Sequence, residues 1–212
     1  MKRETMKNCL SSDPLHTPCP DSRQRHAEAL RDFFLSRNGI ELERACHSLE
    51  GLLPVGLPPI EGWLAAEFAF NRLFVGPAAL EAPPYASAYL DPESLVMGAT
   101  TLEVRDMFSS LGLESPWKNV LPDDHVSLEL DGAVAVEHAV SLSGSSGILE
   151  LRDRFHAHMK TWMPLFIERI RRAPSGHPAI SHAADSLAVW LVGLDEESGE
   201  THDCNAKLGR SV

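Results

Sequence analysis

Apolar residues recur at helical spacing along most of this chain, and that periodicity limits its fold more than any other feature. Between residues 22 and 192, apolar stripes at i, i+3, i+4 and i+7 follow one another. One stripe joins Val104, Met107, Phe108 and Leu111. No segment sustains the alternation of apolar and polar residues that marks a half-buried strand. The pattern predicts an all-α fold, a compact multi-helix bundle.

Local signals divide this bundle into helices. Asn38-Gly39 and Gly76-Pro77 are typical helix stops, and Thr100 to Glu103 has the spacing of a capping box. Pro122 suits the first turn of a helix, and Pro164 is expected to kink or split a later one. We expect helical segments over 22–38, 40–49, 63–75, 100–112, 122–134, 148–166 and 180–191, with a flexible connector at 144–147.

The two ends of the chain lack this periodicity. Residues 1–21 contain three prolines, and residues 193–212 are mostly polar. We therefore expect a loose N-terminal arm over 1–21, a helical domain over 22–192 and a loose C-terminal tail over 193–212. The N-terminus has no apolar stretch of the kind found in secretory signals, and no run is long enough to span a bilayer.

Composition narrows the function. The net charge of −11 argues against binding a phosphate backbone, which needs clustered Lys and Arg. It favours a cationic partner, although solubility alone also explains an acidic surface. The four cysteines form no C-x-x-C pair, so neither a disulfide framework nor a zinc site is expected, and a reducing cytoplasm is the simplest setting.

A long proline-rich loop is expected over residues 76–99, in the middle of the bundle. It contains both tyrosines of the chain, Tyr85 and Tyr89, and the adjacent prolines Pro83 and Pro84. Loops of this length inside a compact domain are often functional. The tyrosines either pin the loop to the core or present a semi-rigid aromatic surface to a peptide.

The run Asp123-Asp124-His125 allows three interpretations. The carboxylates can cap a helix, the group can bind a cationic partner, or the histidine and a carboxylate can act as an acid–base pair. No nucleophile or oxyanion-hole motif accompanies the run. Capping and binding are therefore favoured over catalysis.

Two other patterns suggest chemistry at first sight. His156 and His158 are two residues apart, so on a helix they point to different faces and cannot easily share a metal ion. The 144–147 run Gly-Ser-Ser-Gly lacks the ending of a phosphate-binding loop and is better explained as a linker. We expect no metal site and no cofactor.

Three linked runs resemble the TorD/DmsD-type redox-enzyme maturation chaperones. They are Arg-Leu-Phe-Val-Gly-Pro at 72–77, Pro-Pro-Tyr-x-Ser-x-Tyr at 83–89 and Pro-Asp-Asp-His at 122–125, and the segment 101–112 is also similar. The resemblance covers about residues 22–192. It implies an all-helical cytoplasmic protein without catalytic activity. Such a protein binds the twin-arginine leader of a molybdopterin oxidoreductase and holds back export until the cofactor is loaded.

The resemblance also suggests which residues bind the leader. Their counterparts here are Phe70, Leu73, Pro84, Tyr85, Tyr89, Asp124 and His125. The chain departs from the family pattern at Leu121, where an acidic residue is usual, and at 177–180, which lacks the usual aromatics. Family members occur as monomers or domain-swapped dimers, and some are associated with guanine nucleotides. The alternative functions are a small helical hydrolase or nucleotide-binding enzyme using Asp124 and His125, and a helical ligand-carrying module.

Overall fold

A computed structural model describes residues 20–53, 56–92, 97–114 and 120–194, and this part of the chain contains helices and no β-strand. The expected arm over 1–21 and tail over 193–212 lie, apart from their innermost residues, outside the described residues. The helices are α1 (Pro20–Phe34), α2 (Gly39–Leu49), α3 (Trp63–Phe70), a π-helical turn η1 (Asn71–Val75), α4 (Ser87–Leu90), α5 (Ala99–Ser110), α6 (Val126–Ser143), α7 (Ser146–Arg172) and α8 (Pro178–Val192). The all-α prediction is confirmed.

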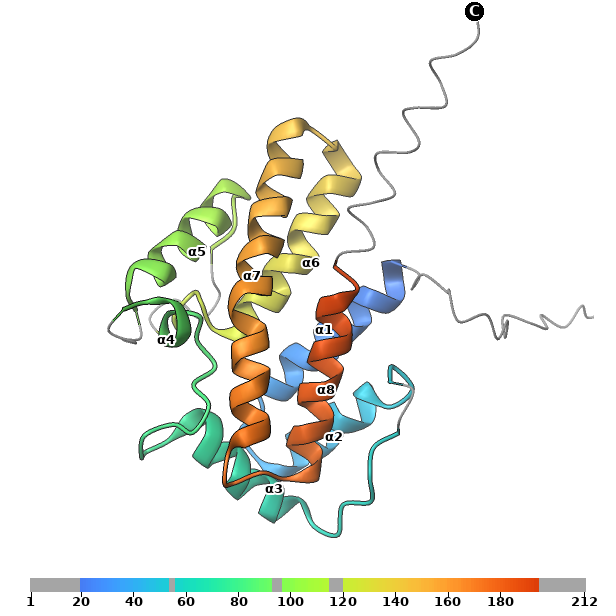
Figure 1. Cartoon of the computed structure of the whole chain (residues 1–212). Helices are drawn as coiled ribbons and strands as arrows, with labels where there is room; N and C mark the ends of the chain where they lie inside the picture. Colours follow the sequence, from blue (N-terminus) through green and yellow to red (C-terminus); the bar gives the residue numbers. More distant parts are fainter. Residues whose placement is uncertain (1–19, 54–55, 93–96, 115–119, 195–212) are drawn as a thin grey trace, which may run out of the picture.

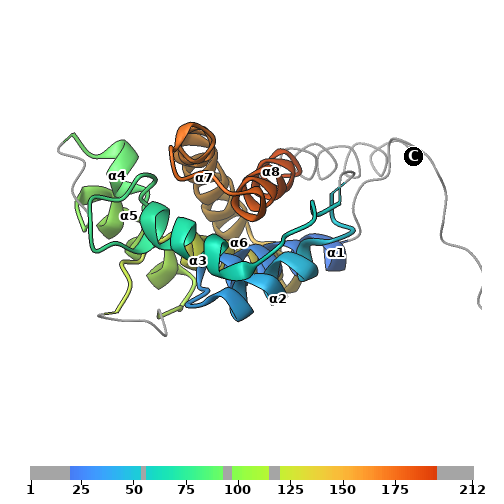
Figure 2. The same cartoon turned by 90° about the horizontal axis from the view of Figure 1, so that it is seen from below.

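The long helices form the body of the molecule. α6 packs against α1 on one side and α7 on the other, and α7 packs against α8. α7 and α8 lie on one side of the layer formed by α1, α2 and α3, as the view along the molecule from below shows (Figure 2). α4 and α5 lie beside α7, away from α8 (Figure 1). No helix in the described ranges is both long and apolar enough to cross a membrane.

Aromatic side chains fill the centre where these helices meet. Phe34 lies edge-on to Phe33 and Phe74, with ring centroids 5.2 and 5.6 Å apart. Phe166 of α7 lies 5.5 Å from Phe34 and 5.6 Å from Trp162. Aromatic pairs at these distances add to the free energy gained by burial. They join α1, η1 and α7 into one core.

Several helix boundaries differ from the expected ones. α5 begins at Ala99 rather than with a capping box, because the Thr100 N–H and hydroxyl both donate to Asp91 of the preceding segment. α7 is not split at Pro164, which lies inside it with its side chain exposed. α6 starts at Val126, so Pro122 precedes the helix. The connector after α6 is shorter than expected, because α7 already starts at Ser146.

The expected loop over 76–99 is not one continuous loop. The short helix α4 interrupts it, and residues 93–96 lie outside the described ones. Glu81 fixes its first half: its carboxylate accepts hydrogen bonds from the Ser175 N–H and hydroxyl and pairs with Arg72. Arg169 of α7 donates to the Glu81 carbonyl oxygen at 2.7 Å. The segment before α4 is therefore held against the end of α7.

Candidate functional site

The two motifs that the sequence singled out lie side by side. Tyr85 and His125 form an isolated antiparallel bridge. On either side of it, the Ala86 N–H donates to the Asp124 carbonyl oxygen at 3.0 Å, and the Val126 N–H donates to the Pro84 carbonyl oxygen at 2.9 Å. These backbone bonds fix the tyrosine loop against the start of α6. Segments about 40 residues apart in sequence thus form one structural unit.

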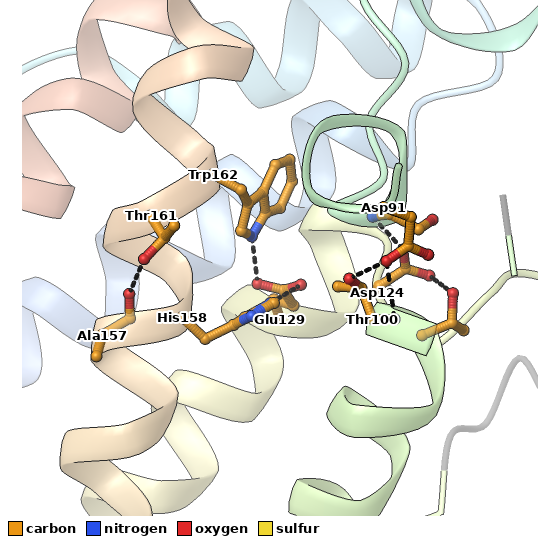
Figure 3. Close-up of polar contacts among 10 residues, drawn as sticks. Asp91, Thr100, Asp124, Glu129, Ala157, His158, Thr161 and Trp162 are labelled. Atoms are coloured by element: carbon orange, nitrogen blue, oxygen red, sulfur yellow. Dashed lines mark hydrogen bonds and ion pairs between the residues drawn. The ribbon is translucent and has the colours of Figure 1, made fainter. Parts of the chain in front are cut away.

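Asp124 holds this unit together from inside. Its side chain is fully buried, and its carboxylate accepts hydrogen bonds from the Ser87 N–H and the Thr101 hydroxyl, both at 2.8 Å (Figure 3). A buried carboxylate is tolerated only where such donors replace water. The side chain therefore joins α4, α5 and the segment before α6.

His125, rather than either aspartate, caps α6. Its Nδ1 accepts a hydrogen bond from the Ser127 N–H at 3.2 Å. Burial lowers the pKa of the ring to about 3, so the ring is neutral at physiological pH. Its edge lies against the Tyr85 ring, with centroids 5.2 Å apart. Asp123, which the sequence also offered as a cap, instead pairs with Arg105 at 2.7 Å.

A groove of about 600 Å³ opens beside this bridge. We call it the Tyr85 groove. Its apolar lining comes from the end of α1 and the residue after it, from α2, α3 and η1, and from the two motif segments: Phe34, Leu35, Ala45, Phe70, Phe74, Val75, Tyr85, Val120 and Leu121; His125 lines it as well. Asp32, Glu41, Arg37 and Arg44 also border it. The groove is thus mainly apolar and aromatic, with charges of both signs along one side.

Three of the seven expected site residues, Phe70, Tyr85 and His125, line this groove. Leu73 and Asp124 are fully buried, and Pro84 is buried as well. These three lie behind the groove.

Tyr89 lies deeper than Tyr85. Its ring packs against Trp162 and Phe166, with centroids 5.8 and 6.2 Å apart, and the Arg169 guanidinium lies over it. Burial raises the pKa of the Tyr89 hydroxyl. Of the two tyrosines, Tyr85 is the one available to a ligand in the groove.

Sequence reasoning missed a second buried carboxylate close by, Glu129 of α6. It accepts a hydrogen bond from Trp162 Nε1 at 2.9 Å and hydrogen-bonds His158 Nε2 at 3.0 Å (Figure 3). Burial raises the pKa of Glu129. Burial alone would lower the pKa of His158, but the Glu129 carboxylate outweighs it and the pKa is raised. An acidic residue on the inward stripe of α6, next to Leu130, was the available signal.

Asp124 and His125 are poorly suited to act as an acid–base pair. Both Asp124 oxygens already accept hydrogen bonds, and the low pKa of His125 leaves it a poor base at neutral pH. Within the described ranges, no group of three or more His, Cys, Asp or Glu side chains could hold a metal ion. Instead, the buried polar groups beside the groove form hydrogen bonds that hold the surrounding segments in place.

Comparisons with known proteins agree with the resemblance seen in the motifs. Residues 38–168 match the family described as nitrate reductase delta subunit. The chain is 32% identical over 130 residues to the Tat proofreading chaperone DmsD of Salmonella typhi, covering 59% of this chain and 60% of that protein. It is 30% identical over 151 residues to the chaperone protein TorD of Vibrio cholerae, covering 66% of each. The matches thus span slightly less than two thirds of these relatives.

A solved structure has the same fold. It is a protein of Archaeoglobus fulgidus assigned to redox enzyme maturation, which superposes with a TM-score of 0.54 at 16% identity over 87% of this chain and 98% of that one. The family match covers more than half of the chain and includes the Tyr85 and Asp124 segments. The chain therefore belongs to the nitrate reductase delta subunit family, with the TorD and DmsD chaperones among its relatives.

Proposed function

We propose that this chain is a cytoplasmic chaperone, without catalytic activity, that binds the twin-arginine leader of a molybdopterin oxidoreductase and assists its maturation before export. The observation that carries the proposal is the Tyr85 groove, where the segments that contain Tyr85 and His125 meet. The names of the DmsD and TorD relatives support the chaperone role. The acting unit is the helical domain of residues 22–192, as a monomer or a domain-swapped dimer.

The groove suits a peptide that is both apolar and cationic. Tyr85 is half-buried and presents its ring to the groove, and the nearly buried rings of Phe70 and Phe74 form part of the lining beneath it. Aromatic side chains of this kind lose little conformational entropy on contact. Asp32 and Glu41 place carboxylates at its border, where they pair with Arg31 and Arg37, so the arginines of a leader would compete with these residues for them. The net charge of −11 attracts a cationic leader and disfavours nucleic acid.

The buried carboxylates support this function indirectly. Asp124 fixes the backbone on which Tyr85 stands, and the groove is already open without a ligand. A preorganised surface loses less free energy on binding. In this proposal Phe70, Tyr85 and His125 contact the leader, and Leu73, Pro84, Tyr89 and Asp124 support them.

Calorimetry with synthetic leaders of the molybdopterin oxidoreductases encoded in the same genome tests the proposal. We expect one leader to bind with a Kd between about 1 μM and 10 nM, and replacement of both its arginines by alanine to weaken binding. Tyr85→Ala should reduce affinity by about 1–3 kcal/mol while changing the free energy of unfolding by less than about 1 kcal/mol.

Tyr85→Phe is the matched control, because it keeps the ring and should keep most of the affinity. Failure of all these leaders to bind the wild-type chain would contradict the chaperone proposal. A Tyr85→Ala variant that binds the leader with unchanged affinity but is much less stable would show that Tyr85 contributes only to packing of the fold.

A further inference from the structure

α3 is a helix without a polar outer face. Its sequence, Trp63–Phe70, contains a single polar residue, Glu67, which points inward and accepts a hydrogen bond from the Gly39 N–H at 2.6 Å. Leu64 and Phe68, which share the outer side of the helix at i, i+4 spacing, are each 63% exposed. A surface helix normally turns charged or polar residues to water, and one that is apolar all round is normally covered. The outer side of α3 therefore has the composition of a contact surface.

This apolar surface continues along the next turn of the chain. Val75, in η1, is 62% exposed and also lines the Tyr85 groove. Phe68 borders a hollow of about 380 Å³ formed with the exposed residues after η1. The charged residue Arg72 lies here too, and it pairs with Glu81 at 3.1 Å. We define the α3 face by Leu64, Phe68, Val75, Pro77, Ala78 and Ala79.

We propose that the α3 face binds the apolar stretch of the leader, while the Tyr85 groove holds the adjoining part with the arginines. This inference rests on the proposed function. Val75 belongs to both surfaces, so a peptide leaving the groove at this residue passes directly onto the α3 face. The leader is expected to run from the charged border of the groove towards Phe68 and Leu64.

The dimensions and charge of the face fit this occupant. The helical stretch Trp63–Val75 is about 20 Å long at 1.5 Å per residue, which matches roughly a dozen helical residues of a leader. An apolar helix lying on an apolar helix face is a common mode of peptide recognition. Arg72, beside the α3 face, is already paired with Glu81, whereas the carboxylates of Asp32 and Glu41 border the groove.

The double variant Leu64→Ser/Phe68→Ser tests the inference. Both side chains are largely exposed, so the fold should not depend on them. With the synthetic leader that binds the wild-type chain best, we expect about tenfold or greater loss of affinity and a less negative heat-capacity change on binding. A leader lacking its apolar stretch should bind wild type and double variant equally weakly. The matched control is Leu142→Ser, because Leu142 is 75% exposed in the last turn of α6. This end of α6 lies at the opposite end of the molecule from α3 (Figure 1), so the replacement should leave binding unchanged.

Two outcomes separate this inference from the proposed function. If the wild-type chain binds a leader and the double variant binds it equally well, the α3 face is not the leader surface, although the chaperone function stands. In that case, a loss of self-association in the double variant, measured by sedimentation velocity, would identify a second copy as the occupant. If the wild-type chain binds no leader, both proposals fail.

Discussion

At the scale of single residues, two fully buried carboxylates determine how the groove is built. Asp124 takes donors from α4 and α5, and Glu129 takes donors from two residues of α7. Because a buried carboxylate is stable only with its partners in place, each one fixes the elements that supply them. The shape of the Tyr85 groove thus depends on side chains that do not line it.

Asp124→Asn tests this structural role. The amide nitrogen would face a donor in place of an acceptor oxygen, so we expect the free energy of unfolding to fall by about 1–3 kcal/mol in urea denaturation, with leader affinity falling as well. Asp123→Asn is the control. Because the partner of Asp123, Arg105, is half exposed, this variant should lose less than about 1 kcal/mol of its free energy of unfolding. Unchanged stability of Asp124→Asn together with weaker leader binding would mean that Asp124 contacts the leader directly.

The sequence identified the right segments but not the direction of every side chain. Tyr85 and His125 stood out by residue type and neighbours, and both line the groove. The partners of Asp124, Ser87 and Thr101, lie 37 and 23 residues away in sequence. No local pattern encodes such contacts, so the interpretation of Asp124 as a partner-binding residue could not be separated from a structural one.

At the scale of helices, local signals predicted well where the determinant is local. Gly76 follows the last residue of η1, as expected of a helix stop. Asn38-Gly39 was expected to end the first helix, but α1 already ends at Phe34, and Asn38 instead caps α2 through the Glu41 N–H. Pro164 does not split α7. Trp162, Met163, Phe166 and Ile167 are buried on either side of it. Their burial outweighs the roughly 3 kcal/mol that a proline costs inside a helix.

Gly132→Ala tests the close packing of α5, α6 and α7. A Cβ atom at Gly132 would lie 2.4 Å from Phe108 Cε1 and 2.8 Å from Phe155 Cζ, so both rings would have to move. We expect the free energy of unfolding to fall by about 1–3 kcal/mol, measured by thermal unfolding. Gly147→Ala, in the open first turn of α7, is the control and should be neutral or stabilising by up to about 1 kcal/mol. If Gly132→Ala is equally neutral, α5 is not packed this closely.

At the scale of the whole molecule, the fold was predictable because helical periodicity repeats over almost all of the described chain. The groove and the α3 face could not be predicted from the sequence, because each combines segments whose proximity depends on tertiary packing. Phe34 and Tyr85, for example, line one groove from α1 and from the segment before α4. Sequence periodicity also marks Leu64 and Phe68 only as apolar, without saying that they face solvent.

The net charge of −11 and the apolar groove predict a mixed response of leader binding to salt. Raising NaCl from 0.1 to 1 M shortens the Debye length from about 10 to about 3 Å, which screens the attraction between the acidic surface and the leader arginines. Apolar burial is not screened, so we expect calorimetric affinity to fall by only about three- to tenfold. A leader with both arginines replaced should lose almost nothing over the same range. A hundredfold fall with the intact leader would mean that charge, rather than the aromatic groove and the α3 face, provides most of the binding free energy.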